Sequence, residues 1–176
     1  MNGRRVWLVT VGVGAAALGA AVAAWRLRPQ PVADGAETAF WAGQWERPEG
    51  GQIRAAELRG GPLLLNFWAT WCPPCVEELP LLERFDREQR GRGWRVLALA
   101  IDQPSAVRAF LQRQPLSLAI GLAGWGGTEL ARQLGNPTGA LPFTVVFDAR
   151  GRLAQRKLGK VEPADLQAWQ AALASG

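Results

Sequence analysis

The chain has 176 residues and a net charge of +5, and 48% of its residues are hydrophobic. This length suits one globular domain with an appendage, and the apolar content allows a substantial core. The basic residues, nearly all arginine, are dispersed and do not form a dense patch interleaved with aromatic residues, which argues against a nucleic-acid partner. Two cysteines and no histidine are too few ligands for a four-coordinate zinc site, so we expect no metal centre of that kind.

The chain begins with an uncharged stretch, residues 6–25, which as a helix is long enough to cross a hydrocarbon core of about 30 Å. Arg4 and Arg5 precede it, and Arg26 and Arg28 follow it. Trp7 and Trp25 lie at its two ends, where interfacial aromatic residues are expected. We therefore predict a signal anchor over residues 1–28, which holds the protein in a bacterial inner membrane as a single-pass protein.

Other interpretations of this stretch stay open. Ala21-Val22-Ala23 fits a signal-peptide cleavage site, which would release the protein to the periplasm, and Arg4-Arg5 faintly resembles a twin-arginine export signal. A buried helix of a soluble protein is a further alternative. The absence of cysteines outside the pair at positions 72 and 75 suits an oxidising compartment, so we expect the remainder of the chain in the periplasm.

After a linker at residues 29–36, we expect one domain over residues 37–176, in which strands and helices alternate. The predicted elements, in chain order, are a hairpin of Phe40–Trp45 and Gln52–Ala55, strand Leu63–Trp68, helix Pro73–Gln89, strand Trp94–Ile101, helix Ser105–Gln112, strand Leu116–Gly121, helix Thr128–Leu134, strands Phe143–Phe147 and Arg152–Leu158, and helix Pro163–Leu173. This alternation predicts an α/β layer with parallel strands at its centre and an antiparallel terminal hairpin at its edge.

The two cysteines lie in Trp71-Cys72-Pro73-Pro74-Cys75, directly after a buried strand and at the start of the next helix. A helix N-terminus favours a thiolate over a thiol, because free N–H groups and a partial positive charge face it. A haem-attachment motif would need histidine where Val76 stands. Two thiols on the first helical turn can form a disulfide and reopen it, so the pattern predicts thiol–disulfide exchange.

Position along the chain gives each residue of this motif an expected role. Cys72, at the helix start, is expected to be the attacking thiol, and Cys75, one turn further in and more buried, the resolving thiol. Trp71 is expected to lie against the site and limit the access of water. Pro73 and Pro74 stiffen the turn and remove N–H donors that would stabilise the Cys72 thiolate.

Together these features resemble the membrane-anchored thioredoxin-like proteins of the TlpA/ResA type, over about residues 37–174. The most specific stretch is residues 65–80, which read Leu-Asn-Phe-Trp-Ala-Thr-Trp-Cys-Pro-Pro-Cys-Val-Glu-Glu-Leu-Pro. Residues 116–134 look like the strand–helix insertion of this family. The resemblance implies a thioredoxin-like fold, with a central mixed sheet flanked by helices, an N-terminal β-hairpin and that insertion.

The segment Leu141-Pro142-Phe143-Thr144 matches the cis-proline loop of the family. The resemblance therefore implies a cis bond between Leu141 and Pro142, beside the cysteines, that leaves the Leu141 backbone free to pair with a substrate chain. Leu141 departs from the small polar residue that often precedes this proline.

Glu78 matches a glutamate that tunes the thiols in the ResA-like subset, whereas thioredoxin carries a buried aspartate at the position of Asn66. The resemblance implies that Glu78 is partly buried near Cys75, with its own pKa and the thiol pKa values raised. A solvated helix glutamate, like its neighbour Glu77, is the alternative.

The leading function is therefore an extracytoplasmic thiol–disulfide oxidoreductase, tethered to the membrane, that reduces substrate disulfides through Cys72 and Cys75 without a further cofactor. The resemblance implies a membrane thiol electron donor of the CcdA/DsbD type, and clients such as apocytochrome c or the copper-site thiols of an oxidase. A disulfide oxidase or isomerase with the same fold is one alternative, and an anchored copper-binding or redox-sensing module is another. Trp125, in a glycine-rich turn, is either a substrate contact or a buried core residue.

Overall fold

The computed structural model describes residue 32 and residues 35–174. Within them a seven-stranded sheet forms the centre, in the order β2-β1-β5-β4-β3-β6-β7. The strands are β1 Gln44–Glu46, β2 Gln52–Arg54, β3 Leu63–Trp68, β4 Arg95–Ala100, β5 Ala119–Leu122, β6 Phe143–Phe147 and β7 Leu153–Leu158. The helices are α2 Ala36–Trp41, α3 Pro73–Gln89, α4 Pro104–Arg113, α5 Gly126–Gln133 and α6 Pro163–Ala174, with short 3₁₀ turns at Ala55–Leu58 and Arg90–Arg92.

The pairing of the strands confirms the predicted mixed sheet. β3, β4 and β5 run parallel at its centre, with Leu64 opposite Val96 and Ala98 opposite Ile120. β6 pairs antiparallel with β3, and β7 antiparallel with β6, so the terminal hairpin forms one edge. The hairpin of β1 and β2 joins the other edge through antiparallel pairing with β5.

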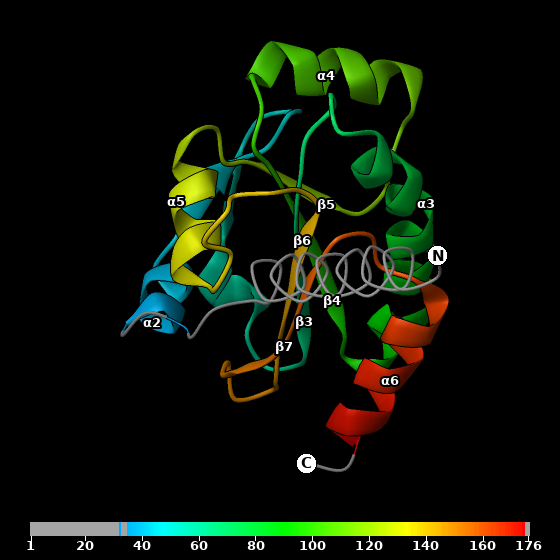
Figure 1. The fold of residues 1–176 in the computed structure, drawn as a ribbon. Coiled ribbons are helices and arrows are strands. Elements are labelled where there is room, and N and C mark those ends of the chain that lie inside the picture. The colour runs from blue at the N-terminus through cyan, green and yellow to red at the C-terminus, as the bar shows by residue number, and fades with distance from the viewer. Residues whose placement is uncertain (1–31, 33–34, 175–176) are drawn as a thin grey trace, which may run out of the picture.

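Alternate residues of the central strands enter two separate cores, because successive side chains of a strand point to opposite faces. On one face α3, α4 and α6 pack against the sheet, and on the other face α2 and α5 do so (Figure 1). Leu64, Val96 and Val146 belong to the first core, and Leu65, Leu97 and Val145 belong to the second. The sheet is therefore covered on both sides, which explains why its central strands are continuous apolar runs.

The predicted strand Phe40–Trp45 is wrong in its first half. Phe40 and Trp41 belong to helix α2, and β1 covers only Gln44–Glu46. Ala36 and Phe40, four residues apart, share one face of α2, and the adjacent Trp41 is also buried. A short apolar run does not distinguish a strand from a helix by itself, and here the helix is formed.

The predicted strand Leu116–Gly121 also begins later than expected, at Ala119. The residues before it form a loop, in which the Ser117 N–H and hydroxyl both donate hydrogen bonds to the Glu83 carboxylate of α3. This side-chain cap replaces the backbone pairing that a longer strand would have supplied.

No helix within the described part of the chain is long and apolar enough to span a membrane. The anchor that we predict at residues 6–25 lies outside the described residues.

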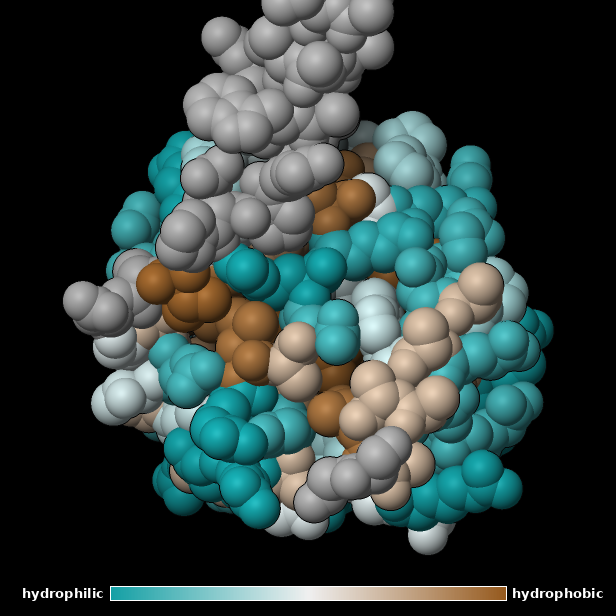
Figure 2. All heavy atoms as spheres, turned by 60° about the horizontal axis from the view of Figure 1, so that its bottom comes forward, coloured by the Kyte–Doolittle hydropathy of each residue, from teal (hydrophilic) through white to brown (hydrophobic). Residues whose placement is uncertain are grey.

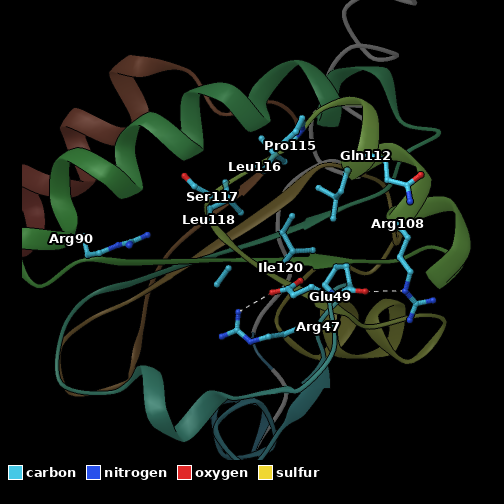
Figure 3. A pocket seen from close by; sticks show the side chains of 13 residues that line it. Arg47, Glu49, Arg90, Arg108, Gln112, Pro115, Leu116, Ser117, Leu118 and Ile120 are labelled. Carbon is cyan, nitrogen blue, oxygen red and sulfur yellow. Dashed lines mark hydrogen bonds and ion pairs between the residues drawn. The ribbon is translucent and has the colours of Figure 1, made fainter.

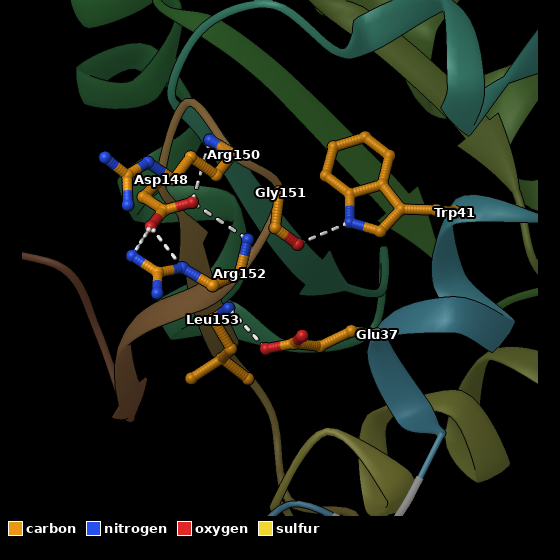
Figure 4. A network of polar contacts seen from close by, with 7 residues as sticks. All are labelled: Glu37, Trp41, Asp148, Arg150, Gly151, Arg152 and Leu153. Atoms are coloured by element: carbon orange, nitrogen blue, oxygen red, sulfur yellow. Dashed lines mark hydrogen bonds and ion pairs between the residues drawn. The ribbon is translucent and has the colours of Figure 1, made fainter.

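Helix α2 is fixed to the turn between β6 and β7 by polar contacts (Figure 4). The Trp41 indole N–H donates to the Gly151 carbonyl at 2.7 Å, and the Leu153 N–H donates to the Glu37 carboxylate at 2.6 Å. Since β6 is antiparallel to β3, this turn lies at the end of the sheet where β3 begins. Figure 2 brings the lower end of Figure 1 forward and shows mainly hydrophilic residues with a narrow hydrophobic band between them.

Candidate active site

Cys72 and Cys75 form a disulfide at the start of helix α3, where β3 has ended. Cys72 is the N-cap residue and has an extended backbone, whereas Cys75 lies in the first helical turn. The side of the disulfide that meets solvent is Cys72, which is 5% exposed, while Cys75 is 0% exposed. This order of exposure suits the predicted attack at Cys72, because an incoming sulfur reaches that sulfur first.

Pro73 and Pro74 occupy the first two positions of α3 and have no N–H. The Val76 N–H donates to the Cys72 carbonyl at 3.1 Å. The first turn therefore offers only the N–H of Cys75 as a donor toward the Cys72 sulfur, fewer than an ordinary helix start presents. We infer that a thiolate at Cys72 receives less hydrogen-bond stabilisation here than at a proline-free helix start.

Trp71 lies next to the disulfide in the chain and leaves 66% of its surface exposed. It lines a groove of about 660 Å³ together with Trp125, Leu141 and Asp102. Trp125 is 89% exposed, so its alternative interpretation as a buried core residue is wrong. The active-site surface therefore carries two solvent-facing indoles.

The Leu141–Pro142 peptide bond is cis, as the resemblance predicts. The loop before it is held by the buried side chain of Asn136, whose amide donates to the Ala140 carbonyl at 2.9 Å and accepts from the Thr138 hydroxyl at 3.0 Å. Within the described residues, the backbone of Leu141 has no hydrogen-bond partner. Leu141 therefore presents a free backbone edge to which another chain can pair.

Glu78 is fully buried, so the alternative of a solvated helix glutamate is wrong, and its burial exceeds the partial burial that we expected. Its carboxylate accepts hydrogen bonds from the Asn66 amide at 2.7 Å and from the Val161 N–H at 2.6 Å. Burial raises the pKa of Glu78 to about 7, although these hydrogen bonds and the charges of Lys160 and Lys157 hold it down. The carboxyl group thus changes its charge near neutral pH.

The position of Glu78 relative to the disulfide follows from the helix. It comes three residues after Cys75, so the two side chains are neighbours on one face of α3, with Cβ atoms about 5–6 Å apart. The Asn66 amide N–H₂ also donates to the Thr144 hydroxyl at 3.0 Å, which joins α3, β3 and β6 beneath the disulfide. The Asn66 oxygen is buried without a partner in the described part of the chain.

The family model of Redoxin matches residues 43–173 of this chain, a range that includes the whole site just described. The chain is a member of the Redoxin family. A Cys-x-x-Cys disulfide at a helix start is suited to thiol–disulfide exchange, because the helix N-terminus favours the attacking thiolate. The protein is therefore a thiol–disulfide oxidoreductase, and its substrates are protein disulfides.

Named relatives agree with this assignment, and a solved structure shares the fold. The chain is 27% identical over 122 residues to the thiol-disulfide oxidoreductase ResA of Bacillus cereus, covering 69% of this chain and 68% of that one. It is 38% identical over 73 residues to ResA of Halalkalibacterium halodurans, covering 41% of this chain and 42% of that one. A thiol:disulfide interchange protein of the thioredoxin family from Chlorobium tepidum TLS matches with a TM-score of 0.64, at 24% identity, over 83% of this chain and 97% of that one.

Sequence reasoning missed Asp102, which fixes the loop of this redoxin that carries Trp71 and Cys72. Its carboxylate accepts hydrogen bonds from the Thr70 N–H at 2.9 Å, from the Thr70 hydroxyl at 2.6 Å and from the Gln103 N–H at 2.7 Å. A signal existed, because Asp102 follows strand β4, and the carboxyl ends of neighbouring parallel strands meet at one edge of a sheet. Asn136 and Thr144 gave no comparable signal.

A larger cavity, of about 720 Å³, lies between the turn after β1, helix α4 and the loop before β5 (Figure 3). Among the described residues, three arginines line it, and each has a partner: Arg47 pairs with Glu49, Arg90 with Asp86, and Arg108 with the Pro48 carbonyl. Neither cysteine and no residue of the cis-proline loop lines this cavity, so size alone would misplace the active site. Within the described residues, no group of three or more His, Cys, Asp or Glu side chains is placed to hold a metal ion.

Proposed function

We propose that this redoxin is a membrane-tethered reductant that acts outside the cytoplasm and passes two electrons from a membrane thiol donor to the disulfides of a few client proteins. The uncharged stretch at residues 6–25 would supply the tether, or a secretion signal if it is cleaved. A donor of the CcdA/DsbD type would reduce the Cys72–Cys75 disulfide back to the dithiol. Clients would be the haem-binding cysteines of apocytochrome c or the copper-site thiols of an oxidase.

The main support for a reductant, as opposed to an oxidant, is the burial of Glu78 one helical turn from Cys75. Strong oxidants of this chemistry owe their high potential to a stabilised reduced form, in which the thiolate is favoured. Here a carboxyl group that ionises near pH 7 opposes a second negative charge beside it, and the two prolines remove N–H donors from the helix start. Both effects weaken the reduced thiolate and shift the equilibrium toward the disulfide, which makes the dithiol a better reductant.

The reaction proceeds in two exchanges. The Cys72 thiolate attacks one sulfur of the substrate disulfide, a Cys72–substrate bond forms, the substrate S–S bond breaks, and the leaving thiolate takes up a proton. The Cys75 thiol then loses its proton and attacks the Cys72 sulfur, which releases the second substrate thiol and forms the Cys72–Cys75 disulfide. The substrate gains two electrons, and the dithiol loses them.

The Asn66 amide suits both protonation states of Glu78. In the structure the Asn66 N–H₂ donates to the Glu78 carboxylate, and the Asn66 oxygen has no partner within the described residues. A half-turn of the amide would present that oxygen to the O–H of a protonated Glu78, while the Val161 N–H remains bonded to the other carboxyl oxygen. Glu78 would then hold and release a proton beneath Cys75 without leaving a buried charge unpaired.

The reduction potential of the Cys72–Cys75 pair tests the proposed direction. The full chain in detergent would be equilibrated with mixtures of reduced and oxidised dithiothreitol, and its free thiols would be counted by alkylation. We expect a potential near or below about −270 mV at pH 7, the range of thioredoxin, whereas a value near about −120 mV would make the protein an oxidant. Glu78→Gln should raise the potential, and Glu77→Gln, an exposed neighbour paired with Lys160, should leave it unchanged.

A further inference from the structure

The groove beside the disulfide exposes two large apolar side chains, Trp71 and Trp125, and within the described residues no other large hydrophobic side chain is exposed. Both indoles line the same groove, together with Ile101 and Leu141. Exposure of apolar surface is unfavourable by about 25 cal/mol for each Å², so such a pair at a reactive disulfide marks a contact surface.

The backbone around Trp125 is held in place by hydrogen bonds and close packing, although the Trp125 side chain itself is exposed to solvent. The N–H groups of Ala123 and Gly124 both donate to the Ala100 carbonyl at the end of β4, at 2.9 and 3.1 Å. Gly124 has a φ of +51°, a conformation that favours glycine. A Cβ atom on Gly127 would lie 2.9 Å from a side-chain carbon of Ile101, so the start of α5 is packed closely against the strand end. The indole therefore projects from a fixed support.

The charge in this groove is negative, in a chain whose net charge is +5. Of the described residues that line it, Asp102 alone is charged. One of its carboxylate oxygens accepts two hydrogen bonds from Thr70, and the other accepts one from Gln103, which leaves the latter oxygen a lone pair for a further donor. Arg132 lies near the rim, next to Gly139, but it is paired with Glu129.

The groove continues directly from the site of exchange. Trp71 and Leu141 line the groove. Trp71 directly precedes Cys72 in the chain, and Leu141 directly precedes Pro142. A polypeptide whose cysteine is joined to Cys72, and which pairs with the free Leu141 backbone, therefore extends along the groove toward Trp125.

We propose that this groove binds a lysine or arginine side chain of the substrate polypeptide, placed within a few residues of the cysteine that Cys72 attacks. The long aliphatic stem packs on Ile101 and Leu141, the cationic head lies over the indole rings of Trp71 and Trp125, and Asp102 pairs with its charge. Indoles attract a cation through the negative face of the ring. This inference rests on the proposed reaction of Cys72 with protein disulfides and adds a substrate preference to it.

The test uses the reduced full chain in detergent and synthetic peptides that carry one cysteine, blocked as a disulfide with 2-mercaptoethanol. Peptides would differ at a single position, occupied by lysine, leucine or glutamate, and that position would be moved along both flanks of the cysteine. The readout is the ratio of second-order rate constants for the lysine and glutamate peptides. A ratio cancels any change in the intrinsic reactivity of the thiol.

At the best position, we expect the lysine peptide to react about tenfold faster than the glutamate peptide, and faster than the leucine peptide, with a ratio that falls as salt is added. Trp125→Ala and Asp102→Asn should each lower the ratio several-fold, while Glu57→Gln, an exposed carboxylate paired with Arg54, should keep it. Because Asp102 also anchors Thr70, the exposed Trp125 gives the variant that is safest for folding.

Three results would overturn the inference: a ratio near one at every position, a leucine peptide as fast as the lysine peptide, or a ratio unchanged by Trp125→Ala. Failure of the proposed function gives a different result, because the wild-type protein would then reduce none of the peptides. Equal reduction of all peptides would leave the function standing and remove the preference.

Discussion

Trp41 and Trp71 lie at opposite ends of the central sheet and differ in what surrounds them. Trp41 is buried, stacks edge-on against Phe40 and Phe147, lies under the Arg59 guanidinium, and donates its N–H to the Gly151 carbonyl. Trp71 makes no aromatic contact within the described residues and leaves most of its surface in solvent. One end of the sheet therefore closes the fold, and the other leaves apolar surface for a partner.

The polar groups at the two ends also differ. At the β6–β7 turn, the Asp148 carboxylate accepts from the Arg150 and Arg152 N–H groups and from the Arg152 guanidinium (Figure 4). Beneath the disulfide, Glu78 is buried with a pKa near neutrality, and the Asn66 oxygen lacks a partner in the described part of the chain. Incomplete pairing of buried groups is costly, and at Asn66 it adjoins the buried carboxyl that we propose to hold and release a proton.

Removing either cysteine should abolish complete thiol–disulfide exchange at the active-site end of the sheet. Cys72→Ser should lower the reduction of insulin disulfides to the uncatalysed rate, because the attacking thiolate is lost. Cys75→Ser should instead accumulate a mixed disulfide with the substrate, visible on a non-reducing gel, because the resolving thiol is lost. The opposite assignment of the two roles predicts that the trapped complex forms with Cys72→Ser.

Truncation of the buried Trp41 should lower the stability of the fold far more than truncation of the exposed Trp71. Trp41→Ala should lower the free energy of unfolding by about 3–5 kcal/mol, since it removes a buried aromatic side chain. Trp71→Ala should change it by less than about 0.5 kcal/mol, as substitutions of exposed side chains do. Urea unfolding of the oxidised full chain, followed by circular dichroism, measures both values, and equal losses would contradict the contrast between the two ends.

The buried carboxyl should make the stability of the oxidised protein depend on pH. The pKa of Glu78 rises from an ordinary value of 4.5 to about 7 in the folded protein, so folding favours the protonated form. The stability that this supplies is present below about pH 4.5 and is lost as the pH rises through 7, by about 3 kcal/mol in total. Glu78→Gln should therefore match the wild type near pH 5 and exceed its unfolding free energy by up to that amount near pH 9. A difference between the two proteins that does not change with pH would contradict this.

Two turn glycines with positive φ form a matched pair, of which Gly151 lies at the closed end and Gly50 in the turn between β1 and β2. Gly151 has a φ of +80°, and a Cβ there would lie 2.6 Å from an Arg59 side-chain nitrogen and 3.0 Å from the Trp41 indole nitrogen. Gly50 has a φ of +102°, but nothing lies within 4 Å of a Cβ there. Gly151→Ala should cost about 1–3 kcal/mol and should exceed the cost of Gly50→Ala, measured by urea unfolding. Equal costs would show that the packing around Gly151 adds nothing to the backbone strain.

Much of the fold was predictable from the sequence, because the apolar runs of β3, β4 and β6 and the Cys-x-x-Cys helix start are strong local signals. Helix α2 was not, because Phe40 and Trp41 form a run too short to show its period. At the site, the resemblance pointed to Glu78 and Pro142, but the depth of burial of Glu78 depends on long-range packing. The groove with Asp102 and Trp125 arises from two loops that only the folded sheet brings together.

The thiol titration of the reduced protein tests most directly whether Glu78 governs the cysteines. The rate of alkylation by iodoacetamide would be measured against pH for the wild type, Glu78→Gln and the matched exposed variant Glu77→Gln. We predict that Glu78→Gln moves the profile to lower pH, because loss of the nearby carboxylate charge favours the thiolate, and that Glu77→Gln leaves it in place. A Glu78→Gln profile that superimposes on that of the wild type would contradict the account.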